Sequence, residues 1–93
     1  MKAEVKNNPA RNRYEIRVGD SVAGFAAYRP RDDAVVFTHT EIDEAYEGQG
    51  LGSALARAAL DDVRASGGAV VPRCPFLKGY IDRHPEYRDL VTA

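Results

Sequence analysis

A glycine-rich turn, Glu47–Ser53, carries the clearest chemical signal in the sequence. Its glycines alternate with other residues directly before an apolar stretch with helical spacing. A glycine turn that leads into a helix leaves unpaired N–H groups beside the positive end of the helix dipole. Such groups bind anions, above all phosphate. We therefore expect a phosphate-binding backbone formed by Gly48, Gln49, Gly50, Leu51, Gly52 and Ser53.

Two titratable residues, His39 and Glu41, come near the end of a run rich in β-branched and aromatic residues, 34–42. Spacing of two places them on one face of a strand, and predicts that Val35 and Phe37 share it. Either can act as a general base or attract a cationic amine, and Glu41 is the preferred base. A polar pair on a solvent-facing strand is the alternative interpretation.

Cys74, the single cysteine, follows Arg73 and precedes Pro75 at an expected helix start. Charge and dipole stabilise a thiolate there, so Cys74 is a candidate acyl acceptor or proton donor. Alternatively, it is a small buried hydrophobe. His84 lies at the expected end of the same helix, where an imidazole caps carbonyl groups. Two histidines and one cysteine so far apart give no metal-ligand spacing, and we expect no metal.

Hydrophobic spacing predicts the elements that position these residues. Alternating and β-branched runs predict an antiparallel meander with strands at 3–6, 13–18, 22–28 and 34–42. Gly19-Asp20 predicts a tight turn between the second and third strands, and 30–33 a turn before the fourth.

The second half of the chain changes to helical spacing. Four-residue apolar spacing predicts a helix over 51–66, ended by Gly67-Gly68. A short strand, 69–72, should run parallel to 34–42, and a second helix begins at Pro75 and ends before Pro85. The prediction is one α/β (α+β) domain over 1–93: a mostly antiparallel sheet with a parallel last strand pair and two helices.

Composition limits the partners of the chain. Its 93 residues carry a net charge of −1 with mixed signs, which argues against a nucleic-acid surface. No apolar run reaches the roughly 20 residues that cross a bilayer, and the first residues lack a signal-peptide pattern. A single cysteine fits a reducing compartment. We expect a cytoplasmic monomer or weak homodimer that binds neither nucleic acid nor membrane.

The order of elements resembles the GNAT superfamily of acyl-coenzyme A-dependent N-acetyltransferases. Gly50 and Gly52 match the glycines of its pyrophosphate motif, Arg/Gln-x-x-Gly-x-Gly/Ala, whereas Glu47 replaces the Arg/Gln. Further motifs are similar to the very short, YjdJ-type members: His39-Thr40-Glu41, Glu47-Gly48-Gln49-Gly50, Cys74-Pro75-Phe76, Tyr80 and His84-Pro85-Glu86-Tyr87. The resemblance covers roughly residues 34 to 90 and implies a minimal GNAT-like fold.

The resemblance also implies a function, transfer of an acetyl group from acetyl-coenzyme A to an amine of a small molecule or protein. The pantetheine arm would pair with the backbone of Ile42, Asp43 and Glu44, with an oxyanion N–H near Ile42. Tyr80 resembles the general acid toward the coenzyme A thiolate, although it also fits an apolar helix stripe. Two alternatives stay open: a non-catalytic acyl-coenzyme A-binding module, and an interaction domain that pairs through the edge of 69–72.

Overall fold

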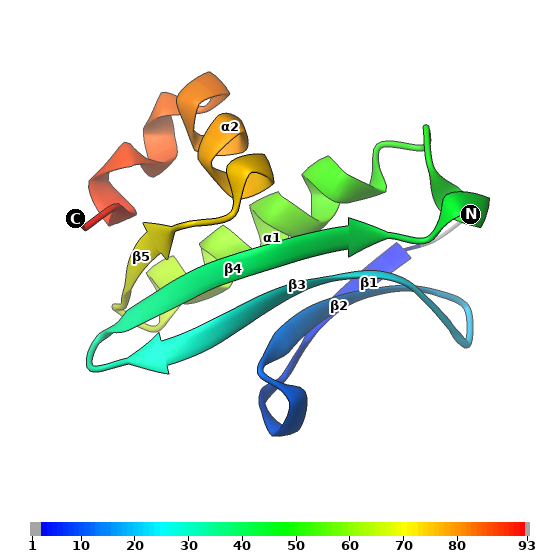
Figure 1. Cartoon of the computed structure of the whole chain (residues 1–93), viewed down its shortest axis with the longest axis horizontal. Coiled ribbons are helices and arrows are strands. Elements are labelled where there is room, and N and C mark those ends of the chain that lie inside the picture. The colour runs from blue at the N-terminus through cyan, green and yellow to red at the C-terminus, as the bar shows by residue number, and fades with distance from the viewer. Residues whose placement is uncertain (1–2, 93) are drawn as a thin grey trace.

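The computed structural model describes residues 3–92, which form one five-stranded sheet with two α-helices (Figure 1). Spatial order follows chain order, β1-β2-β3-β4-β5. The strands are β1 (Ala3–Asn8), β2 (Arg13–Val18), β3 (Ser21–Arg31), β4 (Ala34–Ile42) and β5 (Ala69–Pro72). β1 to β4 pair antiparallel, and β5 pairs parallel to β4. The predicted α/β architecture, with its parallel last pair, is confirmed.

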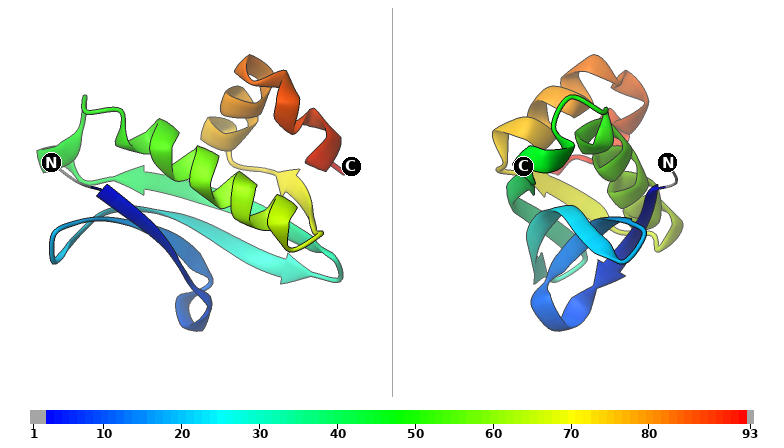
Figure 2. Two further views of the ribbon diagram at one scale, coloured as in Figure 1. Left: turned by 180° about the vertical axis from the view of Figure 1, so that it is seen from behind. Right: turned by 90° about the vertical axis from the view of Figure 1, so that its right-hand side faces the viewer.

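Both α-helices lie on one face of the sheet. α1 (Leu51–Ala65) contacts all five strands, and α2 (Pro75–Arg83) contacts β4, β5 and α1. Figure 2 shows α1 lying along the sheet and α2 standing over the β5 end. Their apolar stripes meet the inward-facing strand residues in a single core. Its largest fully buried side chains are Phe37, Ile16, Leu55, Leu60, Leu77, Val63 and Val70.

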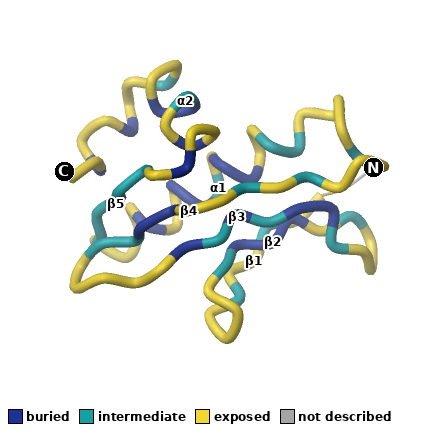
Figure 3. The backbone as a smooth tube through the Cα atoms, viewed as in Figure 1, coloured by how far each residue is buried: buried dark blue, intermediate teal, exposed yellow. Residues whose placement is uncertain are grey.

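The other face of the sheet carries no α-helix within residues 3–92. Figure 3 shows buried residues interspersed with half-buried and exposed ones along the strands. One buried charge interrupts this face: Glu15 is 4% exposed. Burial opposes ionisation of Glu15, but hydrogen bonds from Arg13 and Asn8 outweigh it and lower its pKa. We call this helix-free side the open face.

Two predicted boundaries are wrong. β1 continues through Asn8, and β3 continues through Pro30 to Arg31, so the turn contains only residues 32 and 33. Pro30 is tolerated because the β2–β3 register ends at Arg13 and Ala27, which leaves β3 without a second neighbour at that point.

Three short 3-10 helices complete the described elements: Pro9–Arg11, Glu44–Tyr46 and Pro85–Leu90. After the last of these, Thr92 donates its N–H to the carbonyl of Val70 at 2.9 Å, and Val91 forms a bridge with Val70. The outer edge of β5, predicted as a possible pairing edge for another chain, is therefore partly occupied by residues of the same chain.

Candidate active site

The strands β4 and β5 separate halfway along β4. Their register ends at Phe37 and Pro72. The Phe37 carbonyl then accepts the N–H groups of Arg73 and Cys74, both at 3.0 Å, and the chain turns away into α2. Residues 38–42 keep β3 on one side but have no strand on the other among residues 3–92. This unpaired stretch is the open edge of β4.

Register identifies the backbone groups that the open edge exposes. The N–H of Asp43 bonds to the Ala23 carbonyl at 2.7 Å, so odd-numbered residues at this end of β4 face β3. Alternation along a strand then directs the backbone groups of Thr40 and Ile42 away from β3, into the gap that opens where β4 and β5 separate. Of the three residues predicted to pair with a pantetheine arm, only Ile42 lies there; Glu44 already starts the 3-10 helix. Thr40, which the sequence did not single out for this pairing, lies on the same unpaired edge.

A β-bulge at Thr38 corrects the predicted strand face. His39 pairs with Ala27 and Phe37 pairs with Tyr28, so Thr38 has no partner and the alternation of side chains shifts there. Phe37 is fully buried under the helices, whereas the His39 and Glu41 side chains are 60% and 62% exposed on the open face. They share a face with each other, as predicted, but not with Phe37.

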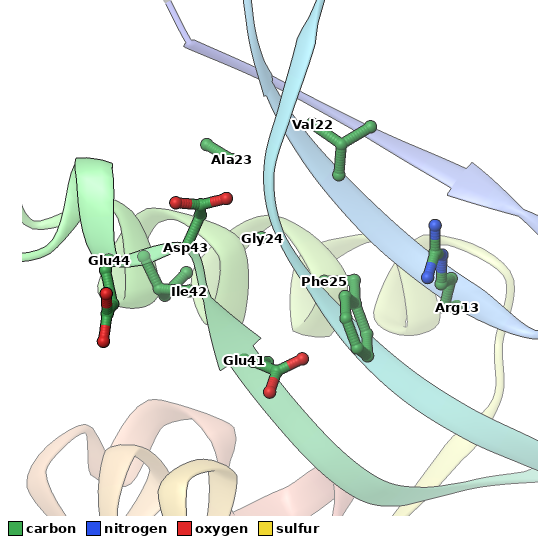
Figure 4. A pocket seen from close by; sticks show the side chains of 9 residues that line it. All are labelled: Arg13, Val22, Ala23, Gly24, Phe25, Glu41, Ile42, Asp43 and Glu44. Atoms are coloured by element: carbon green, nitrogen blue, oxygen red, sulfur yellow. The ribbon is translucent and has the colours of Figure 1, made fainter.

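Glu41 lines a hollow of about 500 Å³ between the start of β3 and the end of β4 (Figure 4). Its Oε1 lies 3.9 Å from the His39 Nε2. Phe25 lies beside Glu41 on β3, and its ring contacts the His39 ring with centroids 6.0 Å apart. Asp43 and Glu44 continue the acidic wall at the end of β4. The hollow thus brings three carboxylates together with one arginine, Arg13, which pairs with Glu15.

The glycine turn leads into the start of α1. Gly48 and Gly50 adopt φ of 80° and 74°, which only glycine takes without strain. Gly50 is the N-cap, and no side chain caps the helix. The N–H groups of Leu51, Gly52 and Ser53 therefore stay available to an anion, because the first intrahelical bond is donated by Ala54.

Gly52 has a packing reason of its own. A Cβ at this position would lie 2.9 Å from Cζ of Phe76, so the Phe76 ring packs over the first turn of α1. Phe76 itself is 37% exposed, one of two large apolar residues at the surface of the described chain. The pair holds the start of α1 against the start of α2.

Cys74 is buried, with 3% exposure, at the N-cap of α2. Its Sγ lies 3.2 Å from Oγ1 of Thr40, so the thiol reaches across the gap between β5 and β4. The burial agrees with the alternative interpretation of Cys74 as a small buried hydrophobe, since the residue belongs to the core.

Tyr80 lies on α2 with 3% exposure and stacks on His84, ring centroids 3.9 Å apart. Its pKa is raised, first by burial and then by Glu86 and Asp61, against the opposing effect of Arg57. Its hydroxyl makes no hydrogen bond within residues 3–92, although no fully buried polar side-chain atom there lacks a partner. It therefore reaches solvent as a protonated phenol. His84 binds the Tyr80 carbonyl through Nδ1 at 2.8 Å, which confirms its predicted capping role.

The candidate residues thus fall on two sides of the sheet. Glu41 and His39 lie on the open face, whereas Cys74, Tyr80 and the glycine turn lie on the helix side. The point where β4 and β5 separate lies between the two groups, and the Thr40 side chain meets the Cys74 thiol there.

The family model for GCN5-related N-acetyl-transferases matches residues 13–90. The chain belongs to the GCN5-related N-acetyltransferase family. The match includes β2 to β5 and both α-helices. Family membership makes the chain an N-acetyltransferase, as the sequence motifs predicted.

Two solved structures from this superfamily share the fold. A GCN5-like protein from Staphylococcus aureus superimposes with a TM-score of 0.72 at 23% identity, over 97% of this chain and 88% of that one. A GNAT-family protein from Desulfovibrio desulfuricans gives a TM-score of 0.55 at 21% identity, over 83% of this chain and 52% of that one. Curated proteins give no significant match.

Two further searches concern other kinds of site. Residues 3–92 contain no group of three or more His, Cys, Asp and Glu side chains arranged to hold a metal ion. Within the same residues, every helix is too short or too polar to cross a membrane.

Proposed function

We propose that the chain binds acetyl-coenzyme A on the helix side of the gap and transfers the acetyl group to an amine that enters from the open face. The open edge of β4 is the observation that carries this proposal. It leaves backbone groups of Thr40 and Ile42 without a strand partner beside the helix start of α1. Unpaired backbone at one edge and unpaired N–H groups at a helix start together suit an extended molecule with a diphosphate.

On the helix side, the chain holds the diphosphate by backbone rather than by side-chain charge. Glu47 stands where the family motif has Arg or Gln, and no cation replaces it in the turn. The N–H groups of Leu51, Gly52 and Ser53 bind the phosphates through hydrogen bonds and the helix dipole. The Thr40 and Ile42 backbone pairs with the pantetheine arm as an added strand. The thioester supplies an activated acetyl group.

On the open face, Glu41 removes a proton from the acceptor ammonium. His39 is the second candidate base, with its Nε2 3.9 Å from the Glu41 Oε1. The N–H of Ile42 points into the gap and stabilises negative charge that develops on the carbonyl oxygen. Tyr80, whose raised pKa keeps it protonated, donates a proton to the leaving thiolate. Transfer is direct, because Cys74 is buried and engaged with Thr40.

Calorimetric titration with acetyl-coenzyme A tests the donor site. Ser53 is exposed at the third helical position of α1, so Ser53→Glu adds a negative charge where phosphates would bind. The same charge favours the helix dipole, so the variant should fold at least as well as the wild type. We expect micromolar binding in the wild type, at least tenfold weaker binding in Ser53→Glu, and unchanged binding in the neutral control Ser53→Gln.

Three outcomes separate the functions. Release of free thiol with an added amine supports the enzyme. Binding without thiol release across a broad amine panel supports a non-catalytic acyl-coenzyme A-binding module. Absence of heat up to about millimolar ligand, roughly −4 kcal/mol of affinity, contradicts both.

A further inference from the structure

A second hollow on the open face gathers three arginines. It has a volume of about 410 Å³ and is lined by Arg29, Pro30, Arg31, Val36, Thr38 and Arg73. These residues come from β3, β4 and the segment directly after β5. Pro30 and Val36 provide an apolar floor, and the Thr38 hydroxyl is a neutral hydrogen-bonding group. We call this hollow the arginine pocket.

The arginines of the pocket have no counter-ions. Within residues 3–92, Arg29, Arg31 and Arg73 form no ion pair and no side-chain hydrogen bond, whereas Arg13 and Arg64 bond to carboxylates at 2.8 and 2.9 Å. The turn residues Asp32 and Asp33 line a neighbouring hollow that Arg31 also lines, without an ion pair to it. In a chain with a net charge of −1, the three arginines form a concentrated positive patch.

The pocket adjoins the point where β4 and β5 separate. Arg73 donates its backbone N–H to the Phe37 carbonyl, where the pairing with β4 ends. Thr38, the bulged residue, follows directly on β4. Glu41 follows three residues later on the same face, roughly 10 Å along the strand. The open face thus has positive charge at one end of the gap and the acidic wall of Glu41, Asp43 and Glu44 at the other.

We propose that the arginine pocket binds an oxyanion, a carboxylate or a phosphate, that the acceptor amine carries. The assignment to the acceptor rests on the proposed function. Guanidinium groups bind oxyanions through paired, charge-assisted hydrogen bonds, which also fix orientation. An ammonium attracted to Glu41 and an anion held by Arg73 would align the acceptor along the gap. The preferred substrate is therefore a zwitterion with its charges about 10 Å apart or less.

Residue-resolved NMR titration with inorganic phosphate, and separately with succinate, tests the pocket without any turnover. We expect shifts of the backbone amides of Val36, Thr38 and Arg73, with at least fivefold weaker binding in Arg73→Gln. Arg11→Gln is the matched control, because Arg11 is exposed and does not line the pocket. Shifts at 48–53 report the separate phosphate site of α1. Unshifted pocket amides, or equal affinity in Arg73→Gln and wild type, overturn the oxyanion site.

Steady-state acetyl transfer tests the acceptor assignment. Amino carboxylates of increasing chain length are compared with their uncharged amides as acceptors. We expect the carboxylates to have at least tenfold higher kcat/KM in the wild type and in Arg11→Gln, and this preference to disappear in Arg73→Gln. Amides that react as well as carboxylates overturn the assignment. If no amine leads to release of free thiol, the proposed function is contradicted instead. The NMR titration still decides the oxyanion site in that case.

Discussion

The two halves of β4 belong to one strand but have opposite roles. Residues 34–37 are paired to β3 and β5 and carry the fully buried Phe37. Residues 38–42 are paired only to β3 and expose His39 and Glu41. The bulge at Thr38 marks the boundary, and the open edge begins there. The chain therefore builds its candidate site where a strand loses a partner, while the paired half anchors it.

This comparison predicts that stability and activity separate along one strand. Substitutions in the first half should unfold the domain, whereas those in the second half should remove acetyl transfer and leave the fold intact. Substitutions on α2, which begins beside the gap, should separate its buried residues into those that support the fold and those that support transfer.

Phe37→Ala should destabilise the fold most. The side chain is fully buried, and its ring lies 6.1 Å from the rings of both Tyr14 and Tyr28. Loss of such a side chain costs about 3–5 kcal/mol, a large fraction of the stability of a domain of this size. Urea denaturation measures the effect. His39→Ala, two residues further along, should change the free energy of unfolding by less than about 0.5 kcal/mol. Similar losses in both variants would contradict the division.

Glu41→Gln should reduce kcat about 100-fold, since a positioned general base contributes about 10²- to 10⁴-fold. The side chain is 62% exposed, so denaturation should give the wild-type midpoint. Glu44→Gln is the control, because Glu44 lines the same hollow from the next turn of chain. If His39→Gln loses more activity than Glu41→Gln, the base is His39.

Tyr80→Phe and Tyr87→Phe should have opposite effects. The Tyr80 hydroxyl has no hydrogen-bond partner in the described chain, so Tyr80→Phe should reduce kcat about tenfold with little change in stability. The Tyr87 hydroxyl donates to Asp61 at 2.7 Å, so Tyr87→Phe should cost about 1 kcal/mol and keep kcat. Equal kcat values in the two variants would remove Tyr80 from the mechanism.

Tyr87 also predicts a pH dependence of stability. Burial and the bond to Asp61 raise the pKa of Tyr87 to about 12. The folded-state pKa lies above the unfolded value of about 10, so the protonated Tyr87 stabilises the fold. This stabilisation is complete below pH 10 and is lost as the pH rises toward 12. The melting temperature of the wild type should fall over that window. The melting temperature of Tyr87→Phe should depend less on pH, and an equal dependence in the two proteins would contradict the assignment.

Cys74→Ala should have only a small effect on activity. The thiol is buried and contacts Thr40, so its removal should cost about 1 kcal/mol of stability and change kcat by less than about threefold. Mass spectrometry after mixing with acetyl-coenzyme A checks the same point. A protein-bound acetyl group on wild type that Cys74→Ala lacks would overturn direct transfer.

Local sequence signals determined the elements and their order. Alternation in 13–18, the glycines around α1 and Pro75 at the start of α2 each depend on a few neighbouring residues, and the structure confirms those elements. The parallel pairing of β5 follows from the handedness and length of a strand–helix–strand unit. Even so, Pro30 was misassigned to a turn, because only the end of β2 frees β3 to accept it.

Tertiary structure alone decided which faces and partners those elements present. The bulge at Thr38 exists through pairing with β3, and it moved Glu41 to the face opposite Phe37. Thr40 meets Cys74 across 34 residues, and the arginine pocket collects side chains from three separate segments. Periodicity fixes how one segment repeats, because that depends on local geometry. It does not fix register or neighbours between segments, because these depend on how the whole sheet and its helices pack.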